Sequence, residues 1–230
     1  MIMRKQIFVL MMFTLGFFLS SCSQPSDISS SDDIEGKLPE PKYKGRISLE
    51  ETLKNRESVR KFENKSLTIE QISQLLWAAQ GVSHSWGERT FRTAPSAGAT
   101  YPLETYLFTQ SGGYKYSPAN HSLTITFDQD LRQDLSDVAL GQTSVSDAHA
   151  VIVFTMVEER TAKRYEERAF RYICMEAGHA AQNVHLQAVA LGLGSVPVGA
   201  FNDNKLAQLL ECSEEEIPLY MIPVGYQVQE

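Results

Sequence analysis

The sequence predicts a single α+β domain in which a mainly antiparallel sheet is flanked by helices. Two β-rich runs, residues 114–116 and 123–127, flank a Ser-Pro-Ala-Asn segment with turn chemistry, which predicts an antiparallel hairpin. Residues 150–156 form an uninterrupted apolar run, as expected for a central strand covered on both faces. Helical patterns at residues 67–81 and 168–190 supply the covering layers, and the mixture indicates an α+β sandwich.

The other helices are predicted from the spacing of apolar residues and from end signals. Residues 49–54 form a short helical pattern, and residues 128–140 form another. In residues 67–81, Thr68 is the expected N-cap and Gly81 the expected stop. The apolar residues of that segment recur at helical spacing: Ile69, Ile72, Leu75, Leu76 and Ala79.

The helix predicted at residues 168–190 carries a stripe of small and apolar side chains. Small residues allow a second helix to approach closely, so we expect this stripe to form the spine of a homodimer. The stripe consists of Ile173, Ala177, Ala181, Val184, Ala188 and Leu191.

Residues 82–92 separate two of these elements and lack periodicity. They contain His84, Trp86, Arg89 and Arg92. Such a segment can border a substrate site, or it can be a surface loop with an incidental tryptophan.

The N-terminus has the pattern of an export signal. Arg4 and Lys5 precede an apolar run at residues 7–18 that is too short to span a bilayer with margin, which is typical of a signal peptide over residues 1–21. The last residues of this segment and Cys22 read Leu-Ser-Ser-Cys, which resembles the bacterial lipoprotein box and predicts a lipidated cysteine. An ordinary signal or anchor helix with an incidental cysteine is the alternative.

Behind the cysteine, the composition changes to Ser, Asp, Pro and Glu with few large apolar side chains. Residues 22–45 are therefore expected to form a flexible tether, and residues 46–230 the folded domain. The location predicted from these features is the cell envelope, on the periplasmic or cell-surface side of a bacterial membrane.

Charge and composition exclude some classes of function. The formal net charge is −7, and loss of residues 1–21 with Arg4 and Lys5 would make it −9, which argues against a nucleic acid partner. Glu176 and His179 form one Glu-x-x-His pair, whereas a dinuclear bundle site needs a second pair. No metal site is expected.

The most informative segment is Thr-Ala-Pro-Ser-Ala-Gly-Ala-Thr-Tyr-Pro-Leu-Glu at residues 93–104. Small residues at this density beside two prolines make a loop whose backbone can approach a flat ligand closely. The Ser96 hydroxyl can meet the polar edge of a ring. These features point to a flavin, with an ordinary turn as the alternative.

Two other segments support a flavin. In residues 56–62, Arg56, Ser58 and Arg60 alternate, so they share one side of an extended chain and can grip a phosphate; a solvated basic rim is the alternative. Residues 191–201 contain several glycines and lead from the end of the long helix to a tight turn at Gly199. At that turn, backbone N–H groups could lie against a ring nitrogen. The alternative there is an ordinary helix C-cap and turn.

Together, these segments resemble the nitroreductase family of flavin mononucleotide (FMN) enzymes, over residues 49–226. The loop at residues 95–104 and the Glu-Ala-Gly-His-Ala-Ala-Gln-Asn run at 176–183, which leads into Leu-Gly-Leu-Gly at 191–194, resemble its SagB/ThcOx-type dehydrogenase branch. The resemblance implies a homodimer with both flavins at the interface. It also implies flavin contacts: Arg56, Ser58 and Arg60 on the phosphate and ribityl chain, Pro95, Ser96, Ala97 and Gly98 along the isoalloxazine, and Val198 and Gly199 on the N5 side.

The chain departs from the resembled pattern at two places. Azoline-oxidising relatives commonly carry a Lys-Tyr pair before the long helix, where this chain has Arg164 and Tyr165. Arginine does not readily release a proton, so Tyr165 is the candidate catalytic side chain, with a packing role as its alternative. The C-terminus also lacks the basic residue with which many nitroreductases close the phosphate site, so phosphate affinity is expected to rest on Arg56 and Arg60.

The function predicted from these observations is hydride transfer through flavin N5 to or from a small molecule or a modified peptide, in a lipid-anchored form. Azoline oxidation and reduction of nitro or quinone compounds both stay open. The alternative from another class is a non-catalytic, lipid-anchored binding module that keeps the fold. Retention of Arg56, Ser58 and Arg60 argues against that alternative, because a pocket without a flavin needs no phosphate grip.

Overall fold

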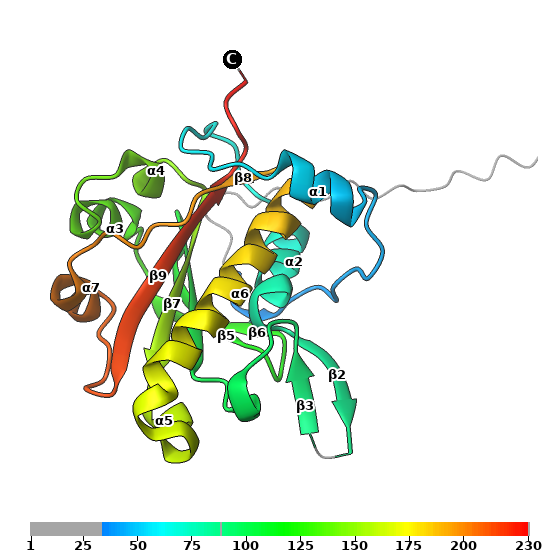
Figure 1. Cartoon of the computed structure of the whole chain (residues 1–230). Coiled ribbons are helices and arrows are strands. Elements are labelled where there is room, and N and C mark those ends of the chain that lie inside the picture. Colours follow the sequence, from blue (N-terminus) through cyan, green and yellow to red (C-terminus); the bar gives the residue numbers. More distant parts are fainter. Residues whose placement is uncertain (1–33, 88, 230) are drawn as a thin grey trace, which may run out of the picture.

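The computed structural model describes residues 34–87 and 89–229, and its framework is a seven-stranded sheet (Figure 1). The strands lie in the order β1-β6-β5-β4-β7-β9-β8, and each neighbouring pair is antiparallel. A two-stranded sheet pairs β2 with β3. The strand bounds are β1 Gly36–Lys37, β2 Val82–Trp86, β3 Arg89–Arg92, β4 Leu103–Thr109, β5 Gly112–Ser117, β6 Ser122–Phe127, β7 Ala150–Val157, β8 Gly194–Ser195 and β9 Glu216–Gly225.

Helices cover both faces of the large sheet, which confirms the predicted α+β sandwich. In Figure 1, α2 and α6 lie on one face, and α3, α4 and α7 lie toward the other. The helix bounds are α1 Leu49–Asn55, α2 Ile69–Gln80, α3 Arg132–Val138, α4 Thr143–Ser146, α5 Glu159–Tyr165, α6 Ala169–Ala190 and α7 Asp203–Leu209; the short 3-10 helices η1 Ala97–Ala99 and η2 Glu166–Arg168 complete the set.

The central strand β7 contributes to two hydrophobic clusters because its side chains alternate between the faces of the sheet. Ile152 and Phe154 belong to the cluster formed with α2 and α6, whereas Val151 and Val153 belong to the cluster that contains Leu206 of α7. β7 is buried from Ala150 to Met156. The prediction of a central strand at residues 150–156 is therefore confirmed.

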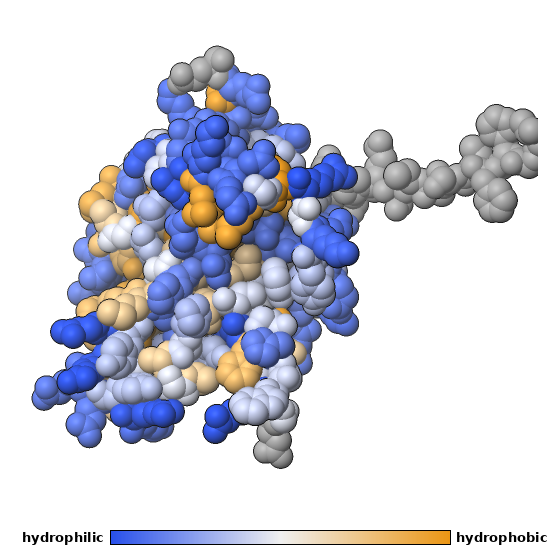
Figure 2. All heavy atoms as spheres, turned by 45° about the vertical axis from the view of Figure 1, so that its right-hand side comes forward, coloured by the Kyte–Doolittle hydropathy of each residue, from blue (hydrophilic) through white to orange (hydrophobic). Residues whose placement is uncertain are grey.

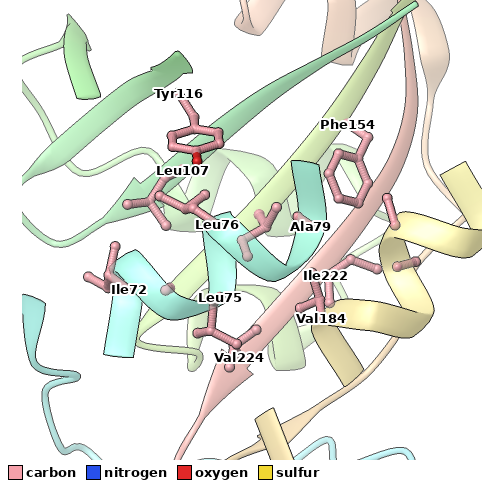
Figure 3. Close-up of a cluster of buried hydrophobic side chains, with 14 of the residues drawn as sticks. Ile72, Leu75, Leu76, Ala79, Leu107, Tyr116, Phe154, Val184, Ile222 and Val224 are labelled. Carbon is pink, nitrogen blue, oxygen red and sulfur yellow. The ribbon is translucent and has the colours of Figure 1, made fainter. Parts of the chain in front are cut away.

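Helix α2 begins and ends where its sequence predicts. The Thr68 hydroxyl accepts a hydrogen bond from the Gln71 N–H, and the Gln71 side chain accepts one from the Thr68 N–H, so the first turn has a capping box. The Gly81 N–H closes the helix on the Trp77 carbonyl. Figure 3 shows the buried face of α2 packed toward the sheet and α6; it consists of Ile72, Leu75, Leu76 and Ala79.

The stripe of small residues on α6 faces the core of its own chain. Ile173, Ala177, Ala181, Val184 and Ala188 are all buried, and they pack in the cluster that α2 and the sheet form. The prediction that this stripe is the spine of a homodimer is therefore wrong. Small side chains were needed at these positions because α2 crosses close to α6 within the subunit.

The opposite face of α6 is exposed. Met175 is 52% exposed on this face, and a Cβ atom on Gly178 would meet no atom within 4 Å. The face of α6 that carries Met175 and Gly178 is therefore open to solvent, whereas Phe170, which is equally exposed, lies at the start of the helix about 140° around the axis from Met175.

The segment at residues 82–92 is a β-hairpin rather than an irregular loop. Val82 pairs with Arg92 and Trp86 with Arg89, and a bulge interrupts the register between Val82 and His84. The hairpin escaped prediction because most of its side chains are exposed, so hydrophobic alternation is absent. The helix predicted at residues 128–140 is present but shorter, from Arg132 to Val138.

The folded structure begins before the predicted domain boundary. Gly36 and Lys37 form β1, which pairs with β6, and Ile34 and Leu38 are buried in the core. The flexible tether predicted for residues 22–45 is thus wrong from Ile34 onward, since two apolar side chains in a polar segment are enough to fix a short edge strand. The predicted signal peptide (residues 1–21) and Cys22 lie outside the described residues. No helix within the described ranges is long and apolar enough to cross a membrane.

Candidate active site

The predicted phosphate grip follows helix α1. A capping box of Ser48 and Glu51 starts this helix, and the Arg56 N–H ends it on the Thr52 carbonyl. The chain then becomes extended: the Val59 N–H donates to the Ser195 carbonyl at 3.0 Å. This backbone contact joins the predicted phosphate segment to the segment that contains Val198 and Gly199.

Exposure in this extended segment does not alternate strictly, because Glu57 and Lys61 are exposed as well as Ser58 and Arg60. Val59 is buried, whereas Ser58 and Arg60 are exposed and Arg56 is half-buried. Val59 seats against Gly194, where a Cβ atom would stand 2.6 Å from the valine side chain. Glycine at position 194 therefore lets β8 and the arginine-bearing segment lie close together.

Both guanidinium groups are available for an anion. Within the described ranges, neither Arg56 nor Arg60 forms an ion pair with a carboxylate, and Arg60 Nη1 donates only a long bond, 3.4 Å, to the Ser58 carbonyl. Two uncompensated arginines beside an exposed serine hydroxyl match the acceptor oxygens of a phosphate.

A buried histidine stands behind this segment. His185 of α6 and Ser195 share a hydrogen bond of 2.6 Å through Nδ1 and Oγ, and the histidine Nε2 is buried with no partner among the described residues. Burial, with a smaller contribution from the positive charge of Arg56, lowers the pKa of His185 to about 4. The ring is neutral near pH 7, so it does not repel the nearby positive charge of Arg56.

Val198 and Gly199 continue from β8 toward α7. Val198 exchanges two backbone hydrogen bonds with Met221, at 2.8 and 3.0 Å, and its side chain is buried. Gly199 is exposed. Only backbone groups of this pair can therefore face a ligand, as expected for contacts to a ring nitrogen.

The loop at residues 93–104 forms a tight surface turn. Ser96 precedes η1, and its hydroxyl accepts a hydrogen bond from the Tyr101 N–H at 2.9 Å. Gly98 has φ of +61°, and Ala99 and Tyr101 also have positive φ values, +54° and +47°. Left-handed conformations at two residues other than glycine indicate a strained backbone, a feature that collects at functional sites.

Helix α5 places Tyr165 against this loop. A Cβ atom on Gly98 would stand 2.8 Å from the Tyr165 hydroxyl and 2.8 Å from Arg164 Nη1. The Tyr165 ring contacts Tyr172 edge-on, with 5.0 Å between the ring centroids. The structure therefore brings together the predicted isoalloxazine loop and the candidate catalytic tyrosine.

Further polar contacts hold α5 and the loop together. The Thr100 and Thr161 hydroxyls are 2.8 Å apart. Arg160 donates to the Tyr101 carbonyl at 3.1 Å and forms an ion pair with Glu104. Loop and helix are consequently fixed as one unit.

A buried polar network beneath the loop was missed by the sequence analysis. Glu176 of α6 is 2% exposed and accepts a hydrogen bond from Gln80 Nε2 at 3.5 Å; the Ser96 hydroxyl lies close enough to this carboxyl group to favour its ionised form. Gln80 Oε1 accepts from Arg92 Nη1 at 3.0 Å. Burial raises the pKa of Glu176 to about 7. The available signal was the glutamine in the last turn of α2, a polar residue on the buried helix face.

The two groups of predicted site residues lie at separate places along α6. Ser96 meets the helix at Glu176, and Ser195 meets it at His185. The nine-residue separation corresponds to about 14 Å along the axis. In Figure 1, α5 lies by the lower end of α6 and β8 by its upper end. In the described part of the chain, no group of three or more His, Cys, Asp or Glu side chains could hold a metal ion.

Comparison with known proteins agrees with this geometry. The model of the nitroreductase family matches residues 53–226. A candidate nitroreductase of Methanocaldococcus jannaschii is 42% identical over 204 residues, which cover 86% of this chain and 99% of that protein. A solved structure of a candidate nitroreductase from Ralstonia eutropha has a TM-score of 0.78 at 31% identity, covering 90% of this chain and 96% of the other.

A more distant relative is the microcin B17-processing protein McbC of Escherichia coli. It is 24% identical over 166 residues, which cover 67% of this chain and 60% of that protein. The family match extends over most of the described residues, from α1 through β9, and includes both groups of predicted site residues. The chain therefore belongs to the nitroreductase family, as a flavin-type oxidoreductase.

Proposed function

We propose that this chain uses FMN to pass a hydride, through flavin N5, to or from a small molecule or a modified peptide, and that it belongs to the SagB/ThcOx-type branch. Likeness to McbC, a microcin B17-processing protein, supports that branch. The observation that carries the proposal is the pairing of a free arginine-serine grip, Arg56, Ser58 and Arg60, with the backbone of Val198 and Gly199 through β8. When bound, the flavin would supply the redox chemistry, and the protein would position it.

The residues present fit FMN at its two ends. Arg56, Arg60 and the Ser58 hydroxyl offer donors to a phosphate, and no acidic side chain of the described residues is paired with either arginine. The tight loop from Pro95 through Ser96 and Ala97 to Gly98 offers small side chains and backbone groups to a ring.

The active form in this proposal is a homodimer in which the loop of the partner subunit completes each site. In a twofold dimer that packs the exposed faces of two antiparallel α6 helices, the N-terminal half of one helix meets the C-terminal half of the other. The loop of one subunit would then lie by the phosphate grip of its partner. Figure 2 shows a hydrophobic patch ringed by hydrophilic residues near α1, where Ile47, Leu49 and Leu53 are exposed; this patch would extend the interface.

Tyr165 is the proposed catalytic residue. Its hydroxyl lies at the loop surface beside Gly98, where it can hold or move a proton on a substrate stacked against the ring. Arg164, next to it, keeps its positive charge and is suited to orient an anionic or carbonyl group rather than to act as a base.

The proposed location is the cell envelope, through a lipid on Cys22. Nicotinamide cofactors are not expected outside the cytoplasm, so a quinone, oxygen or a protein would exchange electrons with the enzyme. This part of the proposal rests on the sequence pattern of residues 1–22 alone.

The test is a flavin-binding measurement on the chain that begins at Ser23. Purified protein is mixed with FMN, freed of excess and examined by visible spectroscopy beside the double variant Arg56→Ala/Arg60→Ala. The matched control, Lys54→Ala/Lys61→Ala, removes two neighbouring exposed cations. We expect the wild type and the lysine control to retain flavin and the arginine variant to lose it. Folded wild-type protein without flavin would instead support the binding module.

A further inference from the structure

Glu176 lies directly beneath the proposed flavin loop, yet the reaction described above gives it no role. The carboxyl group is buried between α6, α2 and the loop, within hydrogen-bond reach of Ser96. A buried carboxyl group that bonds to a residue of the ring-binding surface can act on the cofactor only through that residue.

The orientation of the neighbouring amide is fixed. Arg92 is a donor only, so the Gln80 oxygen must face Arg92, and the Gln80 NH₂ group must face Glu176. Gln80 therefore donates to Glu176 in either protonation state of the acid. Among the described neighbours of Glu176, the Ser96 hydroxyl can either donate to the carboxyl group or accept from it.

The Ser96 hydroxyl has one hydrogen to donate and two lone pairs to share. One lone pair accepts the Tyr101 N–H at 2.9 Å. When Glu176 is ionised, it can only accept, so the serine hydrogen must point inward. When Glu176 is protonated, it can donate to the second lone pair, and the serine hydrogen becomes free to point outward from the loop.

We propose that Glu176 is a positioning residue whose protonation decides whether Ser96 presents a hydrogen-bond donor or an acceptor to the flavin ring. This inference rests on the proposed function, because it takes the loop at residues 95–98 as the ring-binding surface. The polar edge of the isoalloxazine consists mostly of acceptor atoms, so the donor form of Ser96, present with neutral Glu176, is the form that binds more tightly.

The charges around Glu176 leave both protonation states accessible near neutral pH. Burial favours the neutral acid, and the Arg92 guanidinium of β3 favours the carboxylate. Gln80 of α2 and Ser96 of the loop are neutral, and Glu104 of β4 and Arg160 of α5 act on Arg92 rather than on Glu176. The resulting pKa of about 7 places the change within the range of an ordinary binding experiment.

The experiment measures the FMN dissociation constant from pH 6 to 8.5 by quenching of flavin fluorescence. In the wild type we expect affinity to fall by about fivefold as pH rises, the size of one neutral hydrogen bond. Glu176→Gln should keep the low-pH affinity throughout, because an amide N–H donates to Ser96 permanently. Titration of the FMN phosphate is common to all variants and cancels in their ratios.

Two further variants separate a relay from a structural effect. In Ser96→Ala the pH dependence should vanish, and adding Glu176→Gln to Ser96→Ala should change nothing more. Glu216→Gln is the matched control, because Glu216 also accepts hydrogen bonds from hydroxyl groups, those of Tyr106 and Thr155. The FMN affinity of this variant should depend on pH as that of the wild type does. If Glu176→Gln does not fold, the Ser96→Ala profile alone decides.

The outcomes distinguish the inference from the proposed function. A wild type that binds FMN with the same pH profile as Glu176→Gln would overturn the role of Glu176 and leave the flavin enzyme intact. A wild type that binds no FMN at any pH would overturn the proposed function itself.

Discussion

The hydroxyl of Tyr165 lies against the α-carbon of Gly98, so close that a methyl group on the glycine would stand 2.8 Å from the phenol oxygen. Residue 98 also has φ of +61°. Helix α5 and the small-residue loop are thus joined by a contact that only glycine permits.

Gly98→Ala should displace Tyr165 and lower turnover more than it lowers stability. Positive φ alone costs about 1 kcal/mol. Gly87→Ala is the matched control, since Gly87 has φ of +61° but no atom within 4 Å of its Cβ position. Turnover and thermal unfolding of both variants check this; equal losses of turnover in the two variants would mean that the contact is unimportant.

Tyr165→Phe should keep FMN bound and reduce turnover by about 100-fold or more, the range expected when a proton donor or acceptor is removed. The phenylalanine ring retains the edge contact to Tyr172, so packing is preserved. Steady-state rates and the flavin spectrum of the same preparation make the measurement. Unchanged turnover would assign Tyr165 to packing.

Mixed dimers should show whether each site spans two subunits. Arg56→Ala/Arg60→Ala removes the phosphate grip, and Ala97→Trp blocks the ring surface, so neither variant should hold flavin alone. If the partner supplies the loop, a dimer of one variant with the other has one intact site and binds one flavin. The two variants carry different tags, so mixed dimers can be purified and their bound flavin measured. Mixed dimers without flavin would mean that the phosphate grip and the loop of each site come from the same subunit.

Acid should destabilise the protein through its buried histidines. The folded-state pKa of His185 lies below its unfolded value, so stability is present above about pH 6.5 and is lost as pH falls toward 4. His149, whose pKa burial also lowers to about 4, contributes in the same sense. When pH falls from 6.5 to 5, the free energy of unfolding of His185→Gln should decrease by about 2 kcal/mol less than that of the wild type. Urea unfolding across this range tests the expectation.

Glu176 should have the opposite pH dependence. Its folded-state pKa, about 7, lies above its unfolded value, so the wild type loses stability as pH rises from about 4.5 through 7. The upper limit of this loss is about 3 kcal/mol, and Glu176→Gln should not show it. The measurement is the free energy of unfolding of flavin-free wild type and Glu176→Gln between pH 5 and 8.5. If the two proteins show the same dependence on pH, the prediction is wrong.

The sequence predicted the elements whose patterns are local. Thr68 and Gly81 delimit α2 through their own hydrogen bonds, and the short, β-branched apolar run at residues 150–156 is typical of a buried strand. In the arginine segment, Val59 enters the core and Ser58 and Arg60 are exposed, but the exposed Glu57 and Lys61 break a strict alternation.

Features that depend on tertiary partners could not be predicted. The small residues of α6 suit a neighbouring helix in the same subunit as well as in another, and periodicity alone does not distinguish the two. The network of Gln80, Arg92 and Glu176 joins three elements distant in sequence. No local sequence pattern predicts this network; in the structure, Gln80 and Glu176 are buried and Arg92 is half-buried.

The two-residue strand β1 has a mechanical consequence for any form of this protein that is held from its N-terminus. It caps the outer edge of β6, and the sheet order places it six strands away from β8. A pull on the N-terminus would peel β1 and the buried Ile34 and Leu38 away first, and would leave the phosphate segment beside β8 unloaded. The bared edge of β6 could then pair with another chain, so a shortened protein that starts at Arg46 is expected to self-associate.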